Sequence, residues 1–195
     1  MIWKDHSREM PDGFHAFMGG SNYQWLNYSP EKLVETYKNR WAVEEGTALH
    51  ALAEELIKRR IKLKGIQKTF NMYVNDAIGF RMSPEVKLYY SPFCAGTADA
   101  LHYDEKKRFL RIHDLKTGTT PAKLHQLEIY SALFCLDYGI IPGDLGGIEL
   151  RIYQNNDILI GNPEADDIAP IIDKIVTNCK ILEKAVEEKD SWLIM

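Results

Sequence analysis

Cysteine is scarce in this chain of 195 residues, which contains only Cys94, Cys135 and Cys179. An odd number of widely spaced cysteines argues against a disulfide framework and is typical of reduced thiols in a cytosol. No run of about 18 apolar residues occurs, so we expect no membrane span. The first residues, Met1–His6, lack the apolar segment of a secretory signal, and we therefore expect a cytoplasmic protein.

Positive charge is not in excess, because 24 lysine and arginine residues stand against 28 acidic residues and the net charge is −4. This balance excludes a protein that coats nucleic acid by bulk charge. Basic residues gather in one run that consists of Lys58, Arg59, Arg60, Lys62, Lys64 and Lys68. The run is interpreted either as the solvated end of a helix or as a local surface that follows a nucleic-acid backbone.

The length of the chain and its hydrophobic content of 45% are ordinary for a globular protein, and we expect one domain that covers residues 1–195. Residues 1–28 are irregular and rich in aromatics. They are interpreted either as a loop packed over the core or as a flap whose rings stack on bases. Near the other end, apolar residues at alternating spacings of four and three run from Ile168 to Val186. This stripe predicts a helix that packs against a sheet, with an oligomer seam as the alternative.

A β-hairpin is predicted between Gly96 and Lys116. Residues 97–103 and 108–115 favour strands, and the polar residues 104–107 favour a turn between them. With the loop centred between residues 105 and 106, Tyr103 faces Arg108.

In the same register Asp99 faces Ile112, and Asp99, Asp114 and Lys116 emerge on one face of the sheet. Asp99 and Asp114 become diagonal neighbours about 7–8 Å apart at the backbone. A loop with an odd number of residues would instead place them on opposite faces.

Two carboxylates at this separation repel each other unless a cation lies between them. Hard oxygen ligands favour Mg²⁺ or Mn²⁺. Lys116 could then orient a water molecule or stabilise charge that builds on a phosphoryl oxygen. The alternative is a surface hairpin that carries scattered charges.

A first helix is predicted to begin at Ser29-Pro30-Glu31, with Ser29 as its N-cap. Two further predicted helices carry polar residues. One spans about Trp41 to Ile61 and includes Gly46 and His50, which lie one turn apart on the same side. His50 is either a residue at the boundary of the core or a metal ligand. A glycine at position 46 lowers the stability of the helix. A close approach by another segment or a phosphate would explain why glycine is present there.

The second helix spans about Pro121 to Leu136 and places Gln126 and Tyr130 on one stripe. The alternative role for Tyr130 is core packing. A predicted strand over 85–90 begins with Glu85, which either joins the acidic face or is an exposed strand residue.

Together these motifs resemble the PD-(D/E)XK nuclease superfamily. Gly96-x-x-Asp99, then Asp114-Leu115-Lys116, then Gln126-x-x-x-Tyr130 stand in its order, and Gly46-x-x-x-His50 is similar to an upstream pattern of the RecB-like and phage exonuclease branch. The resemblance covers residues 44–130. It implies an α/β fold with a restriction-endonuclease-like core, in which helices flank both sides of a mixed central β-sheet.

The resemblance also implies an activity, a Mg²⁺- or Mn²⁺-dependent deoxyribonuclease. It is expected to act as an exonuclease on DNA phosphodiester bonds in phage-type or host recombination and repair, in the cytoplasm of a bacterial or phage-infected cell. By analogy His50, Asp99, Asp114 and the carbonyl of Leu115 bind the metal, and Lys116 is catalytic together with the two aspartates.

Gln126 and Tyr130 are expected to hold the site and a DNA phosphate near it. Some members of the branch carry a four-cysteine iron–sulfur cluster, which three cysteines cannot supply, so no iron–sulfur cluster is expected here.

The alternative function is a non-hydrolytic DNA-end-binding or scaffold module on the same fold. DNA is the expected partner, and a recombination or single-strand-annealing protein is a candidate partner. The sequence leaves open exonuclease against endonuclease action, polarity and strand preference, one metal ion or two, and the oligomeric state.

Overall fold

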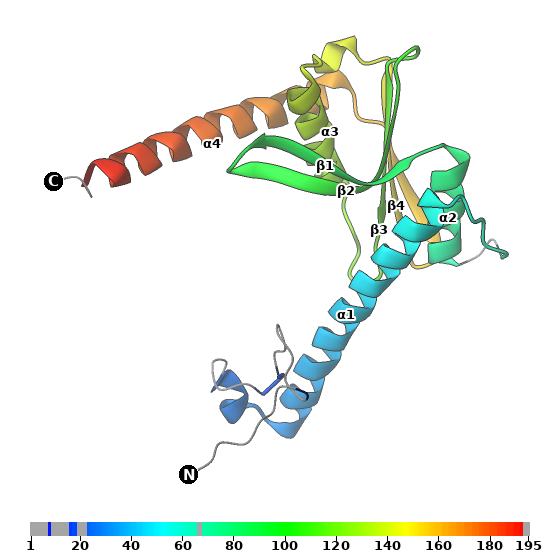
Figure 1. The fold of residues 1–195 in the computed structure, drawn as a ribbon, viewed down its shortest axis with the longest axis vertical. Helices are drawn as coiled ribbons and strands as arrows, with labels where there is room; N and C mark the ends of the chain where they lie inside the picture. The colour runs from blue at the N-terminus through cyan, green and yellow to red at the C-terminus, as the bar shows by residue number, and fades with distance from the viewer. Residues whose placement is uncertain (1–7, 9–15, 19–22, 66–67, 193–195) are drawn as a thin grey trace. The chain divides into compact units, whose positions relative to one another are not determined.

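The computed structural model describes residues 8, 16–18, 23–65 and 68–192 (Figure 1). Contacts between residues divide the chain into two units, 1–45 and 46–195. The expectation of a single domain over residues 1–195 stays a prediction. Most of the irregular N-terminal stretch up to residue 22 lies outside the described residues, so its two interpretations also stay open.

The first unit contains the 3₁₀ helix η1 (Tyr23–Asn27) and the first part of α1 (Pro30–Lys58). The side-chain oxygen of Ser29 accepts a hydrogen bond from the backbone N–H of Lys32 at 3.2 Å, so Ser29 caps the helix. The sequence favoured two separate helices here. The structure joins them in one helix, because no glycine or proline interrupts residues 31–45.

The second unit begins at Gly46 within α1 and contains five strands. The further elements in chain order are α2 (Thr69–Gly79), β1 (Ser83–Ser91), β2 (Cys94–Asp104), β3 (Phe109–Leu115), α3 (His125–Tyr138), η2 (Pro142–Asp144), β4 (Gly147–Gln154), β5 (Asp157–Gly161) and α4 (Ala165–Trp192). Helix α3 begins four residues later than predicted, and Gly139 ends it in the left-handed conformation, with a φ of 64°.

The five strands form one mixed sheet in the order β1-β2-β3-β4-β5. Neighbouring strands pair antiparallel except β3 and β4, which are parallel. Parallel neighbours need a connection that crosses the sheet, and here residues 116–146 with α3 provide it. β3 is buried over most of its length, as expected for a central strand with both faces covered.

Helices cover the two faces of the sheet. On one face Leu110, Ile112 and Leu150 pack with α3 and with Ile168 of α4. On the other face Ala100, Leu115 and Tyr153 pack with α2 and with the part of α1 after Gly46. Figure 1 shows α2 and α3 on opposite sides of β3 and β4. The predicted fold class, an α/β fold with a mixed sheet flanked by helices, is confirmed.

The apolar stripe of α4 packs against the sheet face over its first part, as predicted. Ile168 is fully buried in one cluster with residues of the sheet, and Ile175 packs against this cluster. Cys179 is also buried, with its Sγ 3.1 Å from Oγ of Ser91 in β1, and α4 contacts α3 and η2 in addition. Farther along the helix, Leu182 and Val186 are 44% and 45% exposed, so the stripe is exposed toward its end.

The hairpin register also differs from the prediction, because the loop is shifted by one residue. Tyr103 pairs with Leu110 and Asp104 with Phe109, so the four loop residues are 105–108. The side chain of Asp104 explains the shift, since its Oδ1 accepts hydrogen bonds from the N–H groups of Lys106 and Lys107 at 3.0 and 3.1 Å. The loop keeps an even number of residues, so the predicted sharing of a face is preserved.

Beside α2, the face of β3 and β4 carries a charged network. Glu149 lies between Arg111 and Arg151, with N–O distances of 2.6 and 2.9 Å, and Arg151 also contacts Asp76 at 3.2 Å. Each guanidinium stacks on the ring of Phe80, at 3.9 and 4.7 Å from its centroid. The side chains of both arginines and of Glu149 are less than a fifth exposed, so each charge depends on its partner.

Replacing Glu149 with alanine should lower the free energy of unfolding by about 3–5 kcal/mol, because two poorly solvated guanidinium groups lose their shared carboxylate. Urea denaturation measures this change. The matched control is Asp144→Ala, which removes the half-exposed ion pair with Arg108 and should cost less than about 1 kcal/mol. Equal losses in the two variants would show that the network does not stabilise the sheet.

Candidate metal centre

The carboxylates of Asp99 and Asp114 meet where β2 and β3 separate. The pairing of these strands runs to Ala100 and His113, and one further step in the same register sets Asp99 opposite Asp114. This register favours a directly opposed pair over the predicted diagonal arrangement, although the ladder of β2 and β3 ends one pair earlier. Asp114 is buried, and the side chain of Asp99 is 16% exposed.

Each carboxylate has a partner of its own. Asp99 Oδ2 lies 3.3 Å from His50 Nδ1 and accepts the backbone N–H of Leu115 at 2.8 Å. Asp114 lies against Lys116, whose Nζ is 3.1 Å from Oδ1 and 3.0 Å from Oδ2. The structure therefore gathers His50, Asp99, Asp114 and Lys116, which the sequence had selected from three separate segments.

Glu85 is a further carboxylate of this cluster. Ligand atoms of His50, Glu85 and Asp99 lie within 4.8 Å of one another, so the three side chains could hold a metal ion together. Glu85 lies between two residues of β1 that pair with Ala98 and Ala100, hence opposite Asp99. The sequence left its role open, because only the pairing of β1 with β2 brings it to the site.

The backbone at Glu85 has a φ of 50°, in the left-handed region that non-glycine residues rarely adopt. Such a conformation inside a strand costs about 1–3 kcal/mol and is found mostly at functional sites. The strain at Glu85 is therefore consistent with a carboxylate that is directed toward His50 and Asp99.

The pKa values in the cluster reflect crowded negative charge. Burial and the neighbouring Asp99 raise the pKa of Asp114 to about 6, against the opposing effect of Lys116. Burial and the charge of Asp99 also raise the pKa of Glu85. The hydrogen bond with Asp99 raises the pKa of His50, although burial opposes this. These shifts favour the protonated forms of the groups, and a cation at this place would oppose them.

The residues present fit a hard divalent cation. His50, Glu85 and Asp99 offer one imidazole nitrogen and the oxygens of two carboxylates, a donor set that suits Mn²⁺ and Mg²⁺. The carboxylate of Asp114 interacts electrostatically with Asp99 and His50. Asp114 Oδ2 is buried and makes no hydrogen bond within the described part of the chain, although Lys116 Nζ lies 3.0 Å away. An oxygen in this position is available to a metal ion.

A chain of hydrogen bonds connects Lys116 to α3. Lys116 Nζ donates to Gln126 Oε1 at 2.8 Å, and Gln126 Nε2 donates to the hydroxyl of Tyr130 at 2.9 Å. The ring of Tyr130 lies against Gly96, where a Cβ atom would be 2.7 Å from Cε1 of the ring. Glycine at position 96 therefore permits the ring to pack close to β2.

Gly46 has a similar explanation. It is buried in α1, and a Cβ atom there would lie 2.9 Å from Oγ1 of Thr117. The predicted close approach to this glycine is thus a contact with the segment that follows Lys116. Leu115 is 2% exposed and packs on the α2 face, and the predicted role of its carbonyl as a metal ligand stays a prediction.

The basic run of residues 58–68 is divided in the structure. Lys58 and Arg59 pair with Glu54 and Glu55, one turn earlier in α1. The later basic residues follow the end of the helix. The first part of the run is therefore a helix end with paired charges, and the role of the later part in binding nucleic acid stays a prediction.

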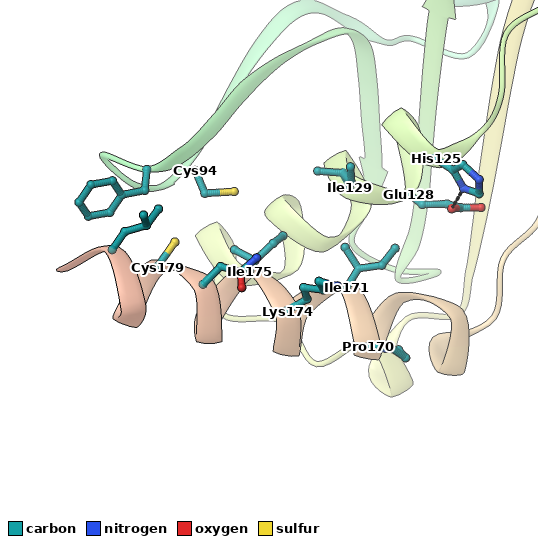
Figure 2. Close-up of a pocket in the computed structure, with 12 residues that line it drawn as sticks. Cys94, His125, Glu128, Ile129, Pro170, Ile171, Lys174, Ile175 and Cys179 are labelled. Carbon is teal, nitrogen blue, oxygen red and sulfur yellow. Dashed lines mark hydrogen bonds and ion pairs between the residues drawn. The ribbon is translucent and has the colours of Figure 1, made fainter. Parts of the chain in front are cut away.

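A groove lies between α3 and α4 (Figure 2). Neither Asp99 nor Asp114 belongs to its lining. It has a volume of about 640 Å³, and most of its lining is apolar, including Ile129, Ile171 and Ile175. His125 and Glu128, joined at 2.9 Å, belong to its lining. None of the predicted site residues lines this groove.

Comparison with protein-family models, with curated proteins and with solved structures finds no match to this chain. No helix in the described ranges is long and apolar enough to cross a membrane.

The affinity for Mn²⁺ should rise as the pH increases from about 5 to about 7.5, because the ion must displace protons from Asp114 and His50. Both groups bind protons more tightly in the folded protein than in isolation, so the competition is strongest below about pH 6. Calorimetric titration in buffers of different ionisation enthalpy measures both the affinity and the protons released. An affinity that does not change with pH would contradict this site.

Proposed function

We propose that this protein is a metal-dependent nuclease that hydrolyses phosphodiester bonds of DNA, as an exonuclease in phage-type or host recombination and repair. The observation that carries the proposal is the group of His50, Glu85 and Asp99, with which the ion pair of Asp114 and Lys116 interacts electrostatically. The resemblance of the motifs to RecB-like nucleases supports the substrate class and the reaction.

In this proposal His50, Glu85, Asp99 and Asp114 hold a Mg²⁺ or Mn²⁺ ion, with the carbonyl of Leu115 as a further ligand by analogy. The bound ion would polarise a phosphate and lower the pKa of a water molecule. Asp114 is buried, and the N–H of Leu115 fixes one oxygen of Asp99, so these two carboxylates offer a rigid pair of ligands.

Lys116 would stabilise the negative charge that develops on the phosphoryl oxygens, or orient the attacking water molecule. Its Nζ has three N–H donors, of which Asp114 and Gln126 accept two. The third donor is available for a phosphate oxygen or for water. The ammonium group is thus held in place while one hydrogen bond remains for the reaction.

Gln126 and Tyr130 would position Lys116 and a DNA phosphate. Gln126 accepts from Lys116 through Oε1 and donates to Tyr130 through Nε2, so both ends of its amide are engaged. The hydroxyl of Tyr130 accepts this hydrogen bond and keeps its own proton to donate to a phosphate oxygen.

Linear duplex DNA with Mn²⁺ should be digested from its ends, whereas covalently closed circular DNA of the same sequence should persist. The RecB-like exonuclease pattern of the motifs supports this preference for ends. Gel analysis of both substrates over time measures it, with EDTA as the control. Discrete fragments from the circle would contradict exonuclease action, and binding of linear DNA without cleavage would favour a non-hydrolytic DNA-end-binding module.

Variants should separate metal binding from chemistry. Lys116→Ala removes a cation but no ligand, so Mn²⁺ affinity should stay equal or increase slightly while the cleavage rate falls by about 10²–10³. Asp114→Ala should lower both the affinity for Mn²⁺ and the cleavage rate. Glu85→Gln should weaken Mn²⁺ binding by a smaller factor than Asp114→Ala. Calorimetry and cleavage at saturating Mn²⁺ measure the two effects. If Lys116→Ala keeps its activity, or if Asp114→Ala binds Mn²⁺ like the parent, the assigned roles are wrong.

A further inference from the structure

A separate cavity lies at the turn end of β2 and β3, at the opposite end of these strands from Asp99 and Asp114. Its volume is about 740 Å³, within the range of ligand pockets in proteins. Aromatic and polar residues both line it, and those that matter here are Tyr103, Glu105, Arg108, Phe134 and Tyr138.

Three aromatic rings form a series along the wall of this cavity. The ring of Tyr103 lies 5.2 Å from that of Phe134, and the ring of Phe134 lies 4.8 Å from that of Tyr138 with an angle of 33° between their planes. Phe134 is buried, whereas Tyr138 is 59% exposed at the end of α3. The series therefore ends in the exposed ring of Tyr138, which packs on the buried ring of Phe134.

Polar groups surround the rings. Arg108 engages Asp144 through Nη2 at 3.2 Å, which leaves N–H donors on the other nitrogens of its guanidinium. Glu105 supplies carboxylate acceptors on the same wall. The cavity thus combines an aromatic surface with both hydrogen-bond donors and acceptors.

We propose that this cavity is a stacking subsite for one nucleobase of a single DNA strand. A base has a flat aromatic face for Tyr138 and an edge that carries both donors and acceptors, which suits Arg108 and Glu105. The inference rests on the proposed function, because a nuclease supplies the reason for a DNA strand to lie near this end of α3.

Helix α3 connects the subsite with the metal centre. Gln126, which binds Lys116, and Tyr138 are twelve residues apart on this helix. At a rise of 1.5 Å per residue they are separated by about 18 Å along the helix axis. A strand bound at both places would therefore span a few nucleotides between the cleaved phosphate and the stacked base.

Charge near the subsite is balanced. The cations Lys106, Lys107 and Arg108 stand against the carboxylates of Asp104, Glu105 and Asp144. Binding at this place would depend on stacking rather than on the release of counterions. The contribution of Tyr138 to affinity should thus change little with salt concentration, unlike that of contacts to the DNA backbone.

The test measures binding of the full chain to a short single-stranded oligonucleotide in EDTA, so that no cleavage occurs. The fluorescent base analogue 2-aminopurine replaces each base in turn, because stacking on a ring quenches its emission. Tyr138→Leu removes the aromatic ring but keeps an apolar side chain, and Tyr138→Phe is the matched control that keeps the ring. Tyr138 is exposed, so we expect both variants to fold, which thermal melting checks.

We expect quenching at one position of the strand in the parent and in Tyr138→Phe, and its loss in Tyr138→Leu. The leucine variant should bind about 5- to 150-fold more weakly, by the same factor at low and high salt. Parent-like binding and quenching by Tyr138→Leu, or a parent that does not bind the strand, would overturn the inference. A separate assay with Mn²⁺ measures cleavage of the oligonucleotide. Stacking without hydrolysis would contradict only the nuclease proposal. Hydrolysis together with parent-like binding and quenching by Tyr138→Leu would contradict only the subsite.

Discussion

The repulsion between Asp99 and Asp114 is the constraint on which the rest of the site depends. The register of β2 and β3 sets the two residues opposite each other where the strands separate. Every contact around them reduces the cost of that arrangement. The N–H of Leu115 and the imidazole of His50 bind Asp99, and Lys116 binds Asp114, while burial and then the charge of Asp99 raise the pKa of Asp114. A divalent cation at this place would further reduce the repulsion.

The parallel pairing of β3 with β4 brings the hydrogen-bonding partners to this site. Because the chain must cross the sheet between these strands, the segment after Lys116 leaves the sheet and returns through α3. The first turns of α3 then place Gln126 and Tyr130 beside Lys116. The crossover thus brings α3 to the same candidate site as β3, and the end of α3 reaches the aromatic cavity.

Two glycines of the sequence pattern are packing contacts, which explains why side chains are absent there. Gly96 makes room for the ring of Tyr130, and Gly46 makes room for Thr117. Both contacts join segments that carry site residues: Gly46 lies one turn from His50, and Thr117 directly follows Lys116. The close approach of these backbones brings His50 of α1 and Asp99 of β2 together at the end of β3.

Local patterns in the sequence were sufficient to predict the alternation of side chains along the strands and the i, i+4 pairing of Gln126 with Tyr130. They also predicted that Asp99, Asp114 and Lys116 share one face of the sheet. These features depend on residues close together in the chain, where the periods of strands and helices apply. The Ser29 cap belongs to the same class. The positions of His50 and Gly46 beside the hairpin followed from the resemblance, since no periodicity relates α1 to β2.

Only the tertiary structure decided the remaining features, because they depend on contacts between distant segments. Glu85 joins the cluster through the pairing of β1 with β2 and through a left-handed backbone that no local pattern indicates. The exact loop register depended on the side chain of Asp104, and the additional contacts of α4 with α3 depended on where α3 crosses the sheet. Pairing of strands and packing of helices are non-local, so the sequence could supply the candidate residues but not the distances between them.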